Sequence, residues 1–166
     1  MRELERDDLP SPLNAALVIV GRGRVGRSLA AAAESAGVEV KLAASDELTQ
    51  CRGAAVLLCV PDEAIAKVAA RVAAEDPALV GHVSGATTLE ALAAAADRGA
   101  STFSLHPLQT FPDGESPIEG TPAAIAGSDA EGLGYARSLA ETLGMRPFEV
   151  SEEYRAAYHA AAAIAS

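Results

Sequence analysis

A glycine-rich turn placed directly after an apolar run constrains the fold of this chain most strongly. Residues 15–20 are continuously apolar, and the hexapeptide GRGRVG follows at once as residues 21–26. A short uninterrupted apolar run indicates a strand that is buried on both faces. Residues 24–36 then have the character of a helix, and Gly37 stands where glycine commonly ends one. The sequence therefore predicts a strand–turn–helix unit with glycines in the turn.

The three glycines have separate uses in such a unit. The first permits the tight turn, the second lets a pyrophosphate approach the backbone, and the third lets the helix pack against the strand. The helix N-terminus adds free N–H groups and a partial positive charge. A strand–helix turn without a ligand is the alternative, but this position in the chain is the context that dinucleotide binding requires. We expect a dinucleotide at Gly21, Arg22, Gly23, Arg24, Val25 and Gly26.

Apolar runs and helical segments alternate along the rest of the chain. Pro61 can open one helix, and capping boxes of Thr87 with Glu90 and of Ser128 with Glu131 can open two more. The alternation predicts an α/β fold with a doubly wound, mainly parallel sheet, which is the Rossmann arrangement. Strands are expected at residues 38–43, 54–60, 79–83, 102–105, 123–126 and 148–150, with a Pro/Gly-rich loop at 107–121.

The expected domain organisation has three parts. Residues 1–13 are charged and then proline-bearing, and are predicted to form a flexible arm. Residues 14–151 form the Rossmann domain. Residues 152–166 begin a helix whose amphipathic pattern has no stop signal, so we interpret them as the start of a connection to a C-terminal helical domain that is absent.

Composition excludes several classes of partner. The formal net charge is −10 and only 4% of residues are aromatic, which disfavours nucleic acid. No apolar run approaches the roughly 20 residues of a membrane span, and the N-terminus lacks a signal peptide's apolar region. Cys51 and Cys59 form neither a disulfide framework nor a metal pattern. We expect a cytoplasmic protein with a small-molecule substrate and no metal.

The end of the second strand should read the adenosine ribose. Ser45 and Asp46 lie there, and a carboxylate from Asp46 would favour NAD by repelling a 2′-phosphate. Asp46 can equally cap a helix starting at Glu47. Three arginines near the turn favour NADP instead, because guanidinium groups suit phosphate: Arg22, Arg24 and Arg27. The choice between NAD and NADP stays open.

Polar side chains follow three strands that end at the same edge of the sheet. Open α/β sheets bind ligands at this edge. Histidine titrates near neutral pH and can relay the proton that accompanies a hydride, although a strand-end histidine often binds a backbone carbonyl instead. The candidate cofactor contacts are Val60, Pro61 and Asp62, and the candidate catalytic residues are His82, Ser84 and His106.

The third histidine lies in the final helix. Tyr154 and Tyr158 are four residues apart, as are Arg155 and His159, so they share a helix face. This face is either the wall of a cleft toward a substrate domain or an ordinary polar stripe. His159 is therefore a further candidate acid or base.

From residue 21 onward the chain resembles a family classed as oxidoreductases, with a Rossmann-like N-terminal domain and a C-terminal helical domain of unknown function. The family is related to pyrroline-5-carboxylate reductase and 6-phosphogluconate dehydrogenase. The motifs that carry the resemblance are GRGRVG (21–26), VPD (60–62), HVSGA (82–86), SLHPLQTF (104–111) and YHAAA (158–162).

The resemblance implies NADP- or NAD-linked chemistry, with the catalytic residue on the helix that leaves the nucleotide domain, in the region of His159. It also implies a homodimer formed through the helical domain, which completes the active site. Relatives often have Arg at the end of the second strand, where this chain has Ser45 and Asp46. Without the helical domain, the chain would hold the cofactor but lack a complete active site.

Two functional hypotheses follow. The first is an NAD(P)-binding domain of an oxidoreductase acting on a small carbonyl, imine or hydroxyl compound. The second is a non-catalytic dinucleotide-binding module or redox sensor, motivated by the missing domain and by the absence of a lysine that such dehydrogenases often use. A weaker third alternative is another nucleotide ligand, such as a deazaflavin or S-adenosylmethionine.

Overall fold

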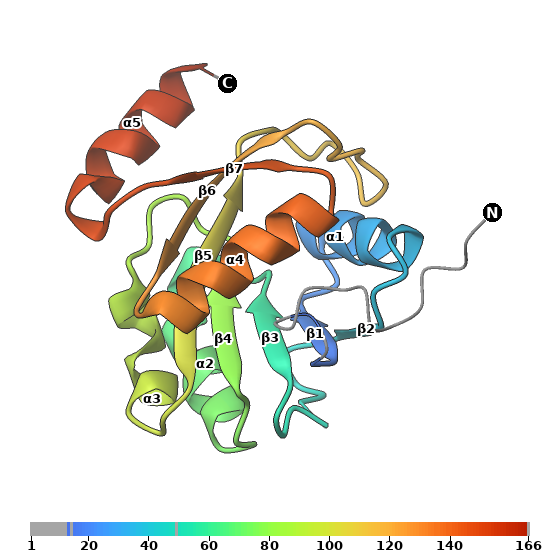
Figure 1. The fold of residues 1–166 in the computed structure, drawn as a ribbon, viewed down its shortest axis with the longest axis vertical. Coiled ribbons are helices and arrows are strands. Elements are labelled where there is room, and N and C mark those ends of the chain that lie inside the picture. Colours follow the sequence, from blue (N-terminus) through green and yellow to red (C-terminus); the bar gives the residue numbers. More distant parts are fainter. Residues whose placement is uncertain (1–12, 14, 49, 166) are drawn as a thin grey trace.

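The computed structural model describes residues 13, 15–48 and 50–165, and within them seven strands form one sheet (Figure 1). The strands are β1 (Leu17–Val20), β2 (Val40–Ala43), β3 (Ala55–Leu58), β4 (Leu79–His82), β5 (Ser101–Pro107), β6 (Pro122–Gly127) and β7 (Arg146–Glu149). The helices are α1 (Arg24–Ser35), α2 (Ile65–Ala73), α3 (Ala93–Ala96), α4 (Ala130–Thr142) and α5 (Arg155–Ala165). Short 3-10 helices precede α2, α3 and α5 at Asp62–Ala64, Leu89–Leu92 and Glu152–Tyr154.

The strand order β2-β1-β3-β4-β5-β6-β7 places a topological switch point between β1 and β3. The chain leaves β1 toward β2 on one side and returns to β3 on the other. The first five strands are mutually parallel. The predicted α/β class with a mainly parallel, doubly wound sheet is confirmed. In such a sheet the crevice at the carboxyl ends of β1 and β3 is the preferred ligand site.

One strand pair departs from the parallel arrangement expected at residues 123–126. β6 runs antiparallel to β5, and β7 is parallel to β6. The reason lies in the connection at 107–121, which contains no helix, whereas a parallel crossover usually needs one. The segment instead returns the chain directly to the same edge of the sheet.

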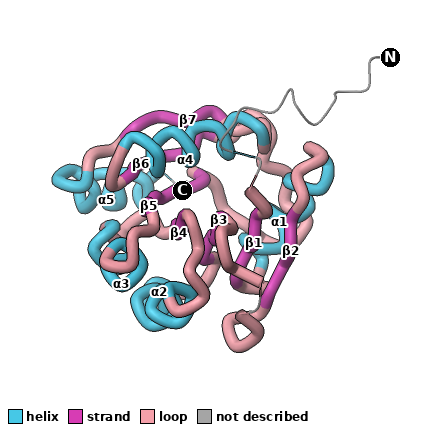
Figure 2. Tube along the Cα trace, turned by 60° about the horizontal axis from the view of Figure 1, so that its bottom comes forward, coloured by secondary structure: helices cyan, strands magenta, loops and turns pink. Residues whose placement is uncertain are grey.

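Two apolar layers hold the sheet between helices. Along β1, Leu17 and Ile19 pack with α1 and α4, while Val18 and Val20 pack with α2 and α3. This alternation follows from the two-residue period of a strand whose two faces are both covered. Figure 2 shows α2 and α3 together on one side of the strands. Leu13, the last residue of the expected arm, is buried in the first layer, and residues 1–12 lie outside the described part.

The capping box predicted at Thr87 and Glu90 is wrong. Thr88 precedes the 3-10 helix, and no described side chain on that helix caps it. The Thr87 hydroxyl accepts a hydrogen bond from Ser84 instead, at 3.0 Å between the oxygens. The first N–H of the helix, that of Leu89, donates to Glu152 Oε2 at 2.6 Å. A carboxylate 63 residues away along the chain thus replaces the local cap.

The capping box predicted at Ser128 and Glu131 is also wrong, by one residue. Asp129 is the N-cap of α4, and its Oδ1 accepts the N–H of Gly132 at 2.8 Å. Ser128 turns to the sheet, where its hydroxyl accepts the N–H of Thr102 at 3.0 Å. The described helices include none that is long and apolar enough to cross a membrane.

Candidate active site

The glycine-rich turn packs tightly against the end of β3. Gly21 has a φ of +121°, and a Cβ there would lie 2.1 Å from the carbonyl oxygen of Cys59. A Cβ on Gly26 would lie 1.9 Å from the carbonyl oxygen of Gly21. Both contacts are with backbone, which cannot move without shifting β1 or β3. Gly21 and Gly26 are therefore required by the fold itself.

Gly23 has a different environment. It is the N-cap of α1, and a Cβ there would meet no described atom within 4 Å. No described side chain caps α1, and its first turn carries no acidic residue. Free N–H groups at an uncapped helix start attract an anion, and a glycine with open space above it lets that anion approach. Unlike Gly21 and Gly26, Gly23 is not required by the packing of the fold.

A cavity of about 350 Å³ lies over the turn at the switch point, and we call it the glycine-loop cavity. Its walls come from α1, from the end of β3, from the residue after β4 and from the loop at 107–121. Phe111 on that loop was not among the candidate residues, although the SLHPLQTF motif contains it. The lining residues are Gly23, Arg24, Val25, Cys59, Val60, Pro61, Val83 and Phe111.

The end of β2 carries the residues expected to read the ribose. Asp46 is exposed on a turn in which the N–H of Glu47 donates to the carbonyl of Ala44 at 3.0 Å. No helix starts at Glu47 in the described residues, so the alternative role of Asp46 as a helix cap is wrong. The carbonyl of Ser45 accepts a hydrogen bond from Arg71 Nη1 at 2.7 Å. The Asp46 carboxylate itself faces solvent.

The arginines of the turn have separate roles. Arg22 forms an exposed ion pair with Glu47, with 2.6 Å between Nη2 and Oε2. Arg27 Nε donates to the carbonyl oxygen of Arg22 at 2.9 Å and so stabilises the backbone of the turn. Arg24 lines the glycine-loop cavity. Asp62 is exposed at the first position of the 3-10 helix after β3, just beyond Pro61.

His82 lies at the end of β4 and is fully buried. Its Nδ1 accepts the N–H of Ser84 at 3.2 Å. Burial, helped by the nearby charge of Arg155, lowers the pKa of His82 to about 4. Ser84 is occupied as well, because its hydroxyl accepts the N–H groups of Ala86 and Thr87. Both side chains therefore serve the turn after β4 in this structure, below the surface that a substrate can reach.

His106, near the end of β5, faces a cavity. Its Nδ1 lies 2.6 Å from the hydroxyl oxygen of Tyr158 on α5. Its ring lies on Gly85, where a Cβ would be 2.8 Å from Cε1 and 2.9 Å from Nε2. Burial lowers the pKa of His106 to about 4, helped by the charges of His159 and Arg155. The imidazole is thus neutral at physiological pH.

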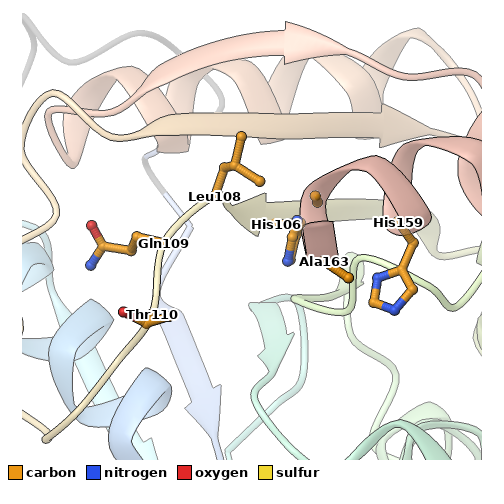
Figure 3. A pocket seen from close by; sticks show the side chains of 7 residues that line it. His106, Leu108, Gln109, Thr110, His159 and Ala163 are labelled. Carbon is orange, nitrogen blue, oxygen red and sulfur yellow. The ribbon is translucent and has the colours of Figure 1, made fainter. Parts of the chain in front are cut away.

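The cavity beside His106 has a volume of about 560 Å³, and we call it the histidine cavity. One wall is the start of the loop at 107–121 and the other is α5, so segments far apart in sequence face each other across it (Figure 3). Sequence reasoning found His106 and His159 but missed the loop residues, which only a known path for the loop could have placed here. The lining residues are His106, Leu108, Gln109, Thr110, His159, Ala162 and Ala163.

Arg155 is the main residue that sequence reasoning missed. It is only 1% exposed, and its Nη1 donates to the carbonyl of Ser84 at 3.2 Å. Its Nη2 donates to the Ser104 hydroxyl at 2.6 Å, and its Nε donates to Glu152 Oε1 at 3.0 Å. These bonds fasten α5 to the turn after β4 and to β5, and the guanidinium charge acts on His82 and His106. Its helical spacing from His159 gave the only signal.

The sites contain no metal cluster: no three His, Cys, Asp or Glu side chains of the described residues could hold an ion together. What the arrangement offers chemically is an open helix N-terminus for an anion and a neutral imidazole facing a separate cavity. Thr110 lines the histidine cavity, and the next residue, Phe111, lines the glycine-loop cavity. The two cavities are therefore neighbours along the same loop.

Two family models match the sequence. One describes a Rossmann-like domain and matches residues 40–107, and the other describes a domain of unknown function, DUF2520, and matches residues 121–166. Comparison with curated protein sequences gives no match. The two models, in this order along one chain, confirm the resemblance to Rossmann-like oxidoreductases that carry a C-terminal domain of unknown function.

Solved structures give the same class of fold. A candidate NADP oxidoreductase from Bacteroides fragilis is 20% identical, with a TM-score of 0.75 over 93% of this chain and 68% of its own. A protein from Thermotoga maritima is 25% identical, with a TM-score of 0.68 over 91% of this chain and 63% of its own. A pyrroline carboxylate reductase from Plasmodium falciparum, solved with NADP bound, is 13% identical, with a TM-score of 0.64 over 92% and 65%.

This chain spans about two thirds of the length of these relatives. It has a Rossmann-like fold, which it shares with oxidoreductases such as the pyrroline carboxylate reductase above.

Proposed function

We propose that this chain is the nucleotide-binding part of an NAD(P)-dependent oxidoreductase that acts on a small carbonyl, imine or hydroxyl compound. One observation carries the proposal: the glycine-loop cavity and the histidine cavity adjoin along one loop, where Thr110 and Phe111 line one each. A cofactor site and a substrate site must adjoin in this way for group transfer between bound molecules.

The residues of the glycine-loop cavity fit a dinucleotide. Gly23 and the N-terminus of α1 would take the diphosphate, and the residues after β3 and β4 with Phe111 offer an apolar wall for a ring. A bound nicotinamide supplies or accepts a hydride. The chain's own contribution is to hold the reacting group beside His106 and to move a proton there.

His106 is suited to that proton transfer because it is neutral and has one nitrogen held by Tyr158. His159 lines the same cavity from α5 and is the second candidate for contact with substrate. His82 and Ser84, engaged in the turn after β4, would support the site from below. These roles support an acid–base pair on one side of the substrate.

The coenzyme preference follows from charge at the end of β2. Two cations lie there: Arg22 pairs with Glu47, and Arg71 Nη1 donates to the Ser45 carbonyl at 2.7 Å. Asp46 adds a second exposed carboxylate. Glu47 and Asp46 thus offset the two guanidinium groups, so the site would bind NADH and NADPH with comparable affinity.

The test is calorimetric titration of the chain with NADH and with NADPH, followed by turnover assays of the longest natural form over panels of ketones, aldehydes and imines. Binding with turnover supports the proposal. Binding without any turnover supports the second candidate, a dinucleotide-binding module or sensor, for which the engagement of His82 and Ser84 in the turn after β4 is the favouring observation. An absence of heat with either dinucleotide at millimolar concentration overturns both.

A further inference from the structure

We infer that Tyr158 and His106 form a two-residue proton relay that presents an N–H donor to the histidine cavity, so that the reacting group of the substrate is a carbonyl oxygen. The inference rests on the proposed function and narrows it from carbonyl, imine or hydroxyl to the reduction of an aldehyde or ketone. It also assigns Tyr158 a part in the chemistry.

The short contact between the two side chains carries the inference. The Tyr158 hydroxyl oxygen lies 2.6 Å from His106 Nδ1, which is a short hydrogen bond. A phenol is a good donor and a poor acceptor, whereas the unprotonated imidazole nitrogen is a strong acceptor. The phenol therefore donates to Nδ1, and the ring proton of the neutral imidazole must be on Nε2.

His106 Nε2 is the nitrogen left for a substrate. Within the described residues no hydrogen bond engages it, and His106 lines the histidine cavity together with Gln109, Thr110 and His159. A neutral imidazole whose free nitrogen carries hydrogen can donate to an oxygen lone pair. It cannot accept a hydrogen bond in that state.

The surroundings keep the imidazole neutral. The groups that act on it are His159 and Arg155 from α5, which disfavour a second proton, and Asp62 after β3, which favours one. Burial has the largest effect, and together with the two α5 residues it brings the pKa of His106 to about 4. Burial likewise raises the pKa of Tyr158, while Arg155 lowers it, so the phenol keeps its proton in the resting protein.

The pair is also held in place. The His106 ring lies so close over Gly85 that a Cβ there would be 2.8 Å from Cε1 and 2.9 Å from Nε2. The Tyr158 ring meets His106 edge-on with centroids 5.6 Å apart, and Phe148 on β7 meets Tyr158 at 6.0 Å. Three elements thus fix one hydrogen bond, which is the arrangement expected where orientation matters.

The relay balances in protons. As the carbonyl carbon receives a hydride from the reduced nicotinamide, its oxygen takes the proton of His106 Nε2. Nδ1 takes the proton of the Tyr158 hydroxyl, so the imidazole stays neutral in the opposite tautomer and Tyr158 becomes a phenolate near Arg155. After the product leaves, Nε2 takes a proton from water and Nδ1 returns its proton to the Tyr158 phenolate, which restores the first tautomer.

The donor on Nε2 selects the substrate class. A ketone or aldehyde oxygen accepts from it, whereas a protonated imine presents its own N–H and would place two donors face to face. Leu108, Ala162 and Ala163 line the rest of the cavity, so the group around the carbonyl should be largely apolar.

The decisive experiment is long-range ¹H–¹⁵N NMR of the histidine side chains in the ligand-free chain at pH 7.5. We expect the His106 signals to show protonated Nε2 and unprotonated Nδ1. In Tyr158→Phe both tautomers should become populated, while Tyr154→Phe, a change of the same kind at a 63% exposed position on the neighbouring turn, should leave the pattern unchanged. A wild-type His106 protonated on Nδ1, or a Tyr158→Phe pattern identical to wild type, overturns the relay.

Gly85→Ala is the second variant. A methyl group there must displace the His106 ring, so the NMR signature of the Tyr158 bond should be lost although Tyr158 is intact. The NMR result does not depend on cofactor. If NMR shows the relay but titration shows that the chain binds neither NADH nor NADPH, the proposed function is refuted and the relay is not. In an active protein, Tyr158→Phe should reduce kcat for ketones about tenfold or more with little change in KM. Reduction of imines in preference to ketones would contradict the substrate class.

Discussion

Nη2 of Arg155 lies 2.6 Å from the hydroxyl oxygen of Ser104, so a guanidinium on α5 is buried against β5 in the middle of the sheet's carboxyl edge. Arg155 also bonds the Ser84 carbonyl and Glu152, and the same Glu152 caps the 3-10 helix at Leu89. The contacts form a single polar connection between α5 and the turn after β4. Because buried charges are stable only when paired and hydrogen-bonded, this connection should respond sharply to mutation.

Replacing Arg155 by Met should lower the free energy of unfolding by about 2–4 kcal/mol, since it leaves the Ser104 and Ser84 acceptors unpaired and Glu152 without its cation. It should also raise the pKa of both His82 and His106, because Arg155 lowers each of them. Chemical denaturation and NMR titration measure the two effects. The control is Arg137→Met, which removes an exposed ion pair with Glu149 and should cost no more than about 1 kcal/mol. Equal losses in the two variants would contradict a structural role for the buried guanidinium.

Gly23→Ala should leave the fold intact and weaken dinucleotide binding by about tenfold or more. The methyl group meets no described protein atom, but it occupies the space through which a diphosphate would reach the backbone. Calorimetry measures the affinity and thermal unfolding the stability. Gly134→Ala in α4 is the matched control, because its methyl group also meets open space and lies on another helix. Gly23→Ala protein that unfolds at a much lower temperature, or binds as wild type does, would count against the open cradle.

Glu47→Gln should increase the affinity for NADPH relative to NADH by about three- to tenfold. The change removes the carboxylate that holds Arg22 and repels a 2′-phosphate, and it leaves the guanidinium free to bind that phosphate. Titrations with both dinucleotides at low salt give the ratio of affinities. Glu141→Gln, an equal change of charge at an exposed position of α4, serves as control. An unchanged ratio would place the selectivity elsewhere, with Asp46 as the next residue to test.

The stability of the domain should fall as the pH is lowered from about 6.5 toward 4. His82 is fully buried with a pKa of about 4 in the fold, against 6.5 for an ordinary histidine. In this window the unfolded chain takes up a proton that the folded chain does not, so the slope from this one group approaches about 1.4 kcal/mol per pH unit. Above pH 6.5 the group contributes no dependence.

Urea unfolding from pH 4.5 to 8 tests this slope. His82→Asn keeps an acceptor for the Ser84 N–H and should remove about half of the slope that the two histidines produce, because His106 also has a pKa of about 4. Any constant loss of stability appears equally at pH 7.5. A variant with the wild-type slope would show that other groups dominate. The variant thus separates titration from packing.

The parts of the structure that sequence predicted are those fixed by local pattern. The run before Gly21 became β1, Gly37 takes a φ of +76° just past α1, and Pro61 stands before the 3-10 helix that leads into α2. Each depends on neighbouring residues alone: uninterrupted hydrophobicity, a left-handed position, or a missing N–H. The glycine-rich turn belongs to this group, since strand, turn and helix are contiguous.

The parts that sequence did not predict depend on contacts between distant segments. Thr87 lost its capping role because Glu152 reaches Leu89 from the other end of the chain. The burial of Arg155 depends on where α5 packs, and no pattern within α5 reveals that its partners are Ser84 and Ser104. β6 is antiparallel to β5 because residues 107–121 contain no crossover helix. The sequence indicated this loop, but the direction of β6 was not predicted from it.

The direct return from β5 to β6 has an effect on how specificity can change. Because the connection at 107–121 needs no crossover helix, it can pass over both cavities. Its second half is bound to α1, where the N–H of Ser116 donates to the Ser28 hydroxyl. Its first half, residues 108–111, lines the cavities, and no hydrogen bond to α1 is seen for these described residues. The residues that line the cavities and the residue that anchors the loop to α1 thus lie in consecutive stretches of one short segment. Substitutions at residues 108–111 can therefore change the cavity walls while the bond between Ser116 and Ser28 keeps the loop attached to α1.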